Sequence, residues 1–156
     1  MRNHGMTVLV AVLALTVVYC HPSYDPRDTA AADAVAKGDL TRARALYEAG
    51  ADVNARFQGG MTVLMMASAR GAVDAVQLLL ELGADPDIKR DDGGTALMSA
   101  VKAGDSRAAR LLIEAGADVS ARDSKGRSAL AIARARDDRV MTALLIEGGT
   151  DEGRTD

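Results

Sequence analysis

The tripeptide Gly-Ala-Asp recurs along this chain at a fixed spacing of 33 residues. It starts at Gly50, Gly83 and Gly116, and a divergent copy, Gly-Thr-Asp, starts at Gly149. Other residues keep the same spacing: Thr62, Thr95 and Ser128; Leu64, Leu97 and Leu130; Ala34, Ala67, Ala100 and Ala133; Gly38, Gly71 and Gly104. A period of this length indicates a stacked repeat protein, in which each unit covers the hydrophobic face of its neighbour.

The composition favours thin layers of helices over a deep core. The 156 residues are 48% hydrophobic but only 3% aromatic, and there is no Trp. Leu, Ala, Val and Met therefore have to fill the interior, which suits paired helices. The net charge of −3 argues against a nucleic-acid partner, because a nucleic-acid surface normally carries a basic stripe.

Each unit is expected to begin with a turn and a short first helix. In the second unit, Gly60 lies where a turn needs a positive φ, and Thr62 lies where a hydroxyl can cap the first turn of a helix. We expect this helix over residues 63–69. Gly71 should end it in a left-handed conformation.

A second helix is expected after each of these glycines. Aspartates in the capping position precede it in three units: Asp39, Asp105 and Asp138. The second unit has Ala72 there, so its cap should be weaker. We expect this helix over residues 73–81, ended by Gly83, with three side chains facing inward: Val76, Leu79 and Leu80.

This layout resembles the ankyrin repeat, including the small exported bacterial members of that family. Gly-x-Thr-x-Leu at 60–64 and 93–97, Gly-x-Ser-x-Leu at 126–130, and Leu-Leu-x-x-Gly-Ala-Asp at 79–85 carry the resemblance. It implies an all-α repeat solenoid of about four ankyrin-type helix-turn-helix units with β-hairpin loops. The units are expected at residues 29–56, 57–89, 90–122 and 123–149, after a linker at 21–28 and before a flexible tail at 150–156.

Two family positions differ here. The usual proline is replaced by Val63, Ala96 and Ala129, and the usual histidine by Met65, Met98 and Ala131. The Thr–His hydrogen bond is therefore absent, which should lower stability without changing the fold. Met65 and Met98 are expected to fill the core rather than to bind a soft metal.

The first twenty residues, 1–20, have the pattern of a signal peptide or an N-terminal anchor. A basic start is followed by an apolar run at 6–19 and then by a polar, proline-marked segment. Cleavage before His21 would give an exported protein, periplasmic or secreted. Alternatively, residues 17–20 resemble a lipobox that would make Cys20 a lipidation site, although Tyr19 stands where that pattern has Gly, Ala or Ser.

The resemblance places a protein partner on the concave face, at the hairpin tips and at the exposed ends of the first helices. The matching residues here are Arg56, Phe57, Gln58, Met61, Arg70, Lys89, Arg90, Asp91, Asp92, Lys102, Lys125 and Arg127. Phe57 has two possible roles, as an anchor for the partner or as a staple that folds back onto the first two units.

The residues do not support catalysis. The repeats contain no His and no Cys, which removes the usual acid–base and thiol groups and zinc ligands. Asp91 and Asp92 lie on an exposed tip, and Asp92-Gly93-Gly94-Thr95 lacks the lysine of a phosphate loop. We expect no enzyme activity, cofactor, metal, small-molecule substrate or nucleic acid, and interpret the chain as a protein–protein interaction module. A lipidated or membrane-anchored structural component of the cell envelope, or an inhibitor or immunity protein, are the alternatives.

Overall fold

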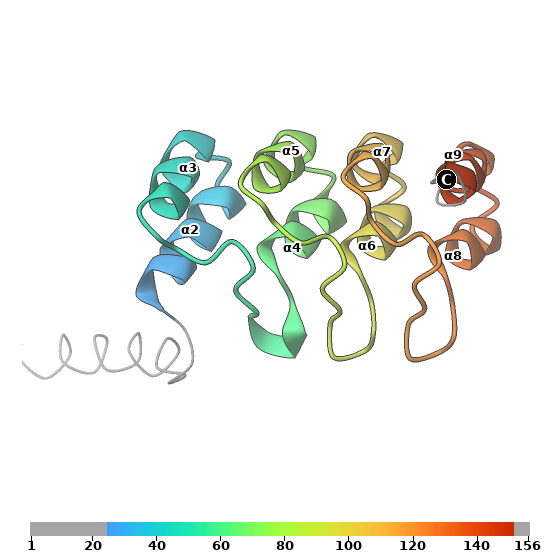
Figure 1. The fold of residues 1–156 in the computed structure, drawn as a ribbon, viewed down its shortest axis with the longest axis horizontal. Helices are drawn as coiled ribbons and strands as arrows, with labels where there is room; N and C mark the ends of the chain where they lie inside the picture. Colours follow the sequence, from blue (N-terminus) through green and yellow to red (C-terminus); the bar gives the residue numbers. More distant parts are fainter. Residues whose placement is uncertain (1–24, 152–156) are drawn as a thin grey trace, which may run out of the picture.

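Residues 25–151 fold into four consecutive pairs of α-helices (Figure 1). The computed structural model describes residues 25–151, so the predictions for residues 1–24, including Cys20, and for 152–156 lie outside it. The pairs are α2 (Pro26–Ala36) with α3 (Leu40–Glu48), α4 (Val63–Arg70) with α5 (Val73–Glu81), α6 (Ala96–Ala103) with α7 (Ser106–Glu114), and α8 (Ala129–Ala135) with α9 (Arg139–Asp151). The predicted all-α repeat solenoid is confirmed.

The pairs stack side by side in two rows. The first helices α2, α4, α6 and α8 form one row and the second helices α3, α5, α7 and α9 form the other (Figure 1). The loops that join successive pairs extend beyond the first-helix row, all on the same side of the stack. The first of these loops contains a short 3₁₀ helix, η1 (Gln58–Gly60).

The first helices begin and end as the sequence predicts. The hydroxyl of Thr62 accepts a hydrogen bond from the backbone N–H of Met65 at 3.3 Å, and the equivalent Thr95 and Ser128 cap α6 and α8 in the same way. In the fourth unit, Asp137 replaces the glycine that ends this helix. It still adopts a left-handed φ of 56° and is the one non-glycine residue with a positive φ in residues 25–151.

The second helices are capped by the predicted aspartates, and α5 lacks such a bond at Ala72. Two helices differ from the expected bounds. Helix α2 starts at Pro26, ahead of the expected unit, because the Asp25 carboxylate caps it and proline suits the first helical position. Helix α9 continues through Gly149 to Asp151. Gly149 lacks the positive φ that ends the second helix at Gly83.

The core runs through all four pairs along the stack. Equivalent leucines on the second helices, Leu79, Leu112 and Leu145, are at most 1% exposed. Leu80, expected to face inward, is only half-buried, whereas Leu78 is buried. Leu78 faces the neighbouring unit, where it lines a groove between α3 and α5, so the buried arc of α5 is centred closer to Leu78 than the sequence pattern indicates.

The Gly-Ala-Asp segments hold successive units together. The Asn54 side-chain carbonyl accepts from the Asp85 backbone N–H, and the Asp87 carboxylate accepts from the Asp118 N–H, both at 2.8 Å. Asp28 on α2 supplies the equivalent acceptor for the first unit. The Asp85 carboxylate in turn accepts from the Asp87 N–H at 2.9 Å. These aspartates therefore turn the chain and link each unit to the one before it.

Candidate functional site

The predicted partner surface is built on three hairpin-shaped loops, residues 57–61, 90–94 and 123–127, which we call the hairpin row. In each loop the first residue donates its N–H to the carbonyl of the fifth: Phe57 to Met61 at 2.7 Å, Arg90 to Gly94 at 2.9 Å and Asp123 to Arg127 at 3.1 Å. Within residues 25–151, the pairing extends to a β-bridge only in the third loop, between Arg122 and Ser128. The hairpins are therefore tight turns with very little strand.

Backbone hydrogen bonds join neighbouring loops of the hairpin row. The Asp91 N–H donates to the Gly59 carbonyl at 3.1 Å, and the Ser124 N–H donates to the Asp92 carbonyl at 2.8 Å. Gly60, at φ 70°, lies so close to the next loop that a Cβ there would be 2.6 Å from Asp91 Oδ1 and 3.0 Å from Asp91 N. The loops thus form one continuous surface.

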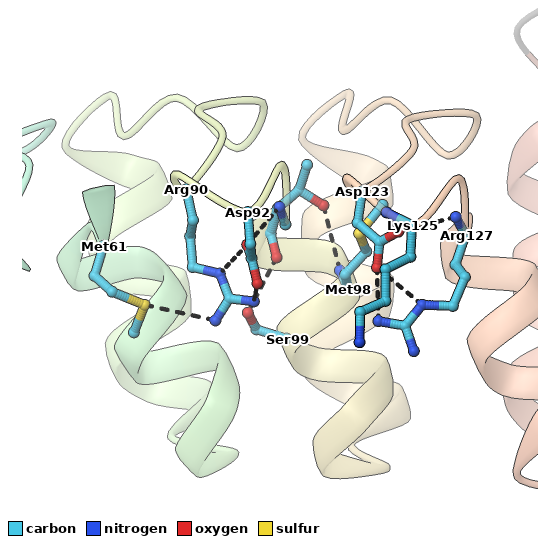
Figure 2. Close-up of polar contacts among 10 residues, drawn as sticks. Met61, Arg90, Asp92, Met98, Ser99, Asp123, Lys125 and Arg127 are labelled. Carbon is cyan, nitrogen blue, oxygen red and sulfur yellow. Dashed lines mark hydrogen bonds and ion pairs between the residues drawn. The ribbon is translucent and has the colours of Figure 1, made fainter. Parts of the chain in front are cut away.

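An ion pair stiffens the second loop (Figure 2). Arg90 donates to Asp92 through Nε at 2.9 Å and Nη2 at 2.6 Å, and its Nη1 lies 3.8 Å from Met61 Sδ. The Gly94 N–H also donates to Asp92 at 2.9 Å. That backbone bond, followed by the Arg90 guanidinium and the charge of Lys102, holds the pKa of Asp92 below its usual range. Arg90 and Asp92 therefore largely neutralise each other's charge and supply each other's hydrogen bonds.

The third loop is organised around Asp123, which the sequence analysis did not single out. Its carboxylate accepts from the backbone N–H groups of Lys125 and Arg127 and from Arg127 Nε and Nη2, at 2.8–3.0 Å. These bonds, led by those from Arg127, lower the pKa of Asp123 to about 2. An aspartate at the first position of a turn that contains Gly126 is a recognisable signal for this role.

The first loop is held by apolar packing and one weak ion pair. The Phe57 ring is half-buried and packs against the core. Arg56 Nη2 lies 3.4 Å from Asp91 Oδ1 and links the first loop to the second. Both side chains are more than half exposed, so the pair adds little stability. Gln58 is exposed at the tip.

The remaining predicted residues are cationic and lie at helix ends or beside the loops. Arg70 and Lys102 occupy the last turns of α4 and α6, where a cation complements the helix dipole. Lys89 and Lys125 lie beside and within the hairpin row. All four are exposed, and within the described part of the chain none of them forms a side-chain ion pair. The surface therefore presents mainly positive charge to solvent.

The two adjacent carboxylates on the second tip, Asp91 and Asp92, each form an ion pair with an arginine, Arg56 and Arg90 respectively. Among residues 25–151, no group of three His, Cys, Asp or Glu side chains is arranged to hold a metal ion. None of the helices in this range combines the length and apolar character needed to cross a membrane.

Two family models match the chain. One, described as ankyrin repeats in many copies, matches residues 46–97, and the other, described as ankyrin repeats in three copies, matches residues 82–156. Together they extend from α3 to the end of the sequence. A comparison with curated proteins finds no match.

Proposed function

Because the chain belongs to the ankyrin-repeat family, whose repeats generally mediate protein–protein interaction, we propose that it binds a protein partner without catalysis. The binding surface consists of the hairpin row, on the concave face expected for the family, together with the adjoining ends of α4 and α6. Members of the family are generally non-catalytic. The ion pairs of Asp91 and Asp92 on the second tip are consistent with a binding role.

The observation that carries this proposal is the bonding between loops. Asp91 and Ser124 each donate a backbone hydrogen bond to the preceding loop, and the Arg90–Asp92 and Asp123–Arg127 pairs brace the loops internally. A surface already fixed before binding loses less conformational entropy when it meets a partner.

The exposed lysines supply the most direct test, because they are not part of the braces. We expect Lys102→Glu combined with Lys125→Glu to abolish capture of the partner from extracts of the source cells, since both charges invert on the binding surface. Arg110→Glu, an exposed position on α7 in the second-helix row, is the matched control and should leave capture unchanged. Equal capture by all three proteins would show that the hairpin row is not the binding surface.

We also propose that the protein acts after export, on the basis of the apolar run at residues 6–19. The alternative, a lipid anchor on Cys20, would make it a structural component of the envelope. The mass of the mature protein separates the two. A first residue of His21 supports soluble export, a diacylated Cys20 supports the anchor, and an intact Met1 with soluble behaviour contradicts both.

A further inference from the structure

The repeat period shows that the first unit has a short side chain where the next two units have a long one. Met65 on α4 and Met98 on α6 are each 1% exposed, so both long side chains are enclosed within the stack. The equivalent residue 33 positions before Met65 is Ala32 on α2. Alanine lacks the long side chain, so the space between α2 and α4 is not filled from the α2 side.

A cavity occupies this place. It has a volume of about 300 Å³ and its apolar wall is made chiefly of Ala32, Val35, Val63, Met66 and Ala67. We call it the α2–α4 cavity. Helix α2 also contacts α4 over a shorter stretch than α4 contacts α6. A cavity of roughly 150 Å³ with apolar walls is enough to bind benzene, so this one can hold a large apolar side chain.

The charges around the cavity have one sign. Lys37 and Arg70 line it, and none of its lining residues is acidic. Lys37 is already paired with Asp33 at 2.6 Å. Arg70 makes only a long hydrogen bond, 3.4 Å from Nη1 to the Ala36 carbonyl. Since a guanidinium has five N–H donors in a planar fork, Arg70 retains the capacity to bind a carboxylate through two parallel bonds.

We propose that the α2–α4 cavity receives an apolar side chain of the protein partner, from a segment that also carries an acidic residue paired with Arg70. This assignment rests on the proposed function, because Arg70 belongs to the predicted partner surface. It adds the chemistry of the ligand: a short segment with an aliphatic or aromatic residue next to Asp or Glu. Ala32, which lines the cavity, is a position at which the first unit departs from the next two.

The test uses a random 12-residue peptide display library selected in parallel on the wild-type protein and on Ala32→Met. The methionine restores the side chain of the two inner interfaces and fills the cavity. Ala30→Met is the matched control, because it makes the same change on the same helix at a half-buried residue that does not line the cavity. Affinities of the enriched peptides are then measured by fluorescence polarisation.

We expect peptides with an apolar residue beside Asp or Glu to be enriched on the wild type. Ala32→Met should weaken them about tenfold or more, the loss expected when one apolar side chain cannot be buried. Ala30→Met should leave their affinity unchanged, and Arg70→Glu should weaken them. In the wild type, the Met66 methyl resonance should shift on titration while that of Met141, buried in α9, stays fixed. This readout does not depend on how well any variant folds.

Each other result overturns the inference. Peptides that bind the wild type and Ala32→Met equally, without shifting Met66, refute the cavity but leave the hairpin row intact as a binding surface. Enriched peptides without acidic residues refute the role of Arg70. If no peptide is enriched, or if octanoate shifts Met66 while none of the enriched peptides does, the cavity does not receive a peptide. The capture experiment with the lysine variants then still decides the proposed function.

Discussion

Leu79 lies at the centre of the stack, and its truncation measures how much one fully buried side chain contributes to stability. Leu79 is 0% exposed on α5, the second helix of the second pair. Leu79→Ala removes three carbons, which at ~0.8 kcal/mol per buried methylene amounts to about 2.4 kcal/mol. The cavity left behind contributes a further loss of at most about 2 kcal/mol. We therefore expect the free energy of unfolding to fall by roughly 2.5–4.5 kcal/mol in total.

Leu80→Ala is the matched control, because it removes the same atoms from the next residue of the same helix. Leu80 is half-buried, so we expect the loss to be roughly 1 kcal/mol. The difference between the two variants cancels the change in helix propensity and isolates burial. Domains are typically stable by about 5–15 kcal/mol, so we expect Leu79→Ala to remain folded at room temperature.

Urea unfolding followed by circular dichroism at 222 nm gives both values from the shift of the midpoint at constant slope. A reduced slope would mean that the two halves of the stack unfold separately, as repeat arrays do when cooperativity is lost. The reasoning fails if Leu80→Ala costs as much as Leu79→Ala. It also fails if Leu79→Ala lowers the free energy of unfolding by less than about 1 kcal/mol, because truncation of a fully buried leucine to alanine lowers it by about 2–5 kcal/mol.

Three further changes test local features of the fold. Ala72→Ser should supply the missing cap of α5 and raise the free energy of unfolding by about 1 kcal/mol, measured by urea unfolding; no gain would contradict the uncapped end. Asp137→Gly should raise it by up to about 1 kcal/mol, because glycine takes the left-handed φ without cost, and a loss would mean that the aspartate side chain is needed. The pKa of Asp123 is lowered from 3.8 to about 2, so its contribution to stability is complete above about pH 4 and is lost as the pH falls to about 2. In urea unfolding between pH 7 and 2, Asp123→Asn should therefore have a lower midpoint than the wild type near pH 7 and an equal midpoint near pH 2. A difference that stays constant with pH would refute the lowered pKa of Asp123.

The helices and their caps could be predicted from the sequence because each is set by local residues that recur in phase. Thr62 caps the start of α4 and Gly71 ends it, and both act through bonds to nearby backbone groups of the same segment. Asp137 shows the limit of this reasoning: the break in the glycine series did not change the backbone, which keeps the left-handed turn with an aspartate in it. The end of α9 was missed for a related reason. Gly149 keeps a helical backbone in place of the positive φ of Gly83, so the divergent Gly-Thr-Asp copy does not end the helix.

The candidate site was harder to predict, because its organisation depends on contacts between loops. The sequence marks Arg90 and Asp92 as charged tip residues, but only the fold shows that they bind each other and that Asp123 braces the next loop. The α2–α4 cavity likewise requires neighbouring helices to be placed side by side. The 33-residue spacing does show that Ala32 occupies the position of Met65 and Met98. The meaning of this short side chain becomes clear only when α2 and α4 are placed next to each other.

The side-chain links between units determine how a protein of this kind can grow by gene duplication. The block 57–89 contains both a donor, the Asp85 N–H, and an acceptor, the Asp87 carboxylate. A second copy inserted in frame would therefore find a matching partner on each side and add one loop to the hairpin row. At the equivalent position of the next block, Ser120 donates its hydroxyl to Asp118 at 2.6 Å and offers no comparable carboxylate. An insertion after the block 57–89 thus meets the same side-chain acceptors as the present stack, whereas one after the next block relies on the Ser120 hydroxyl.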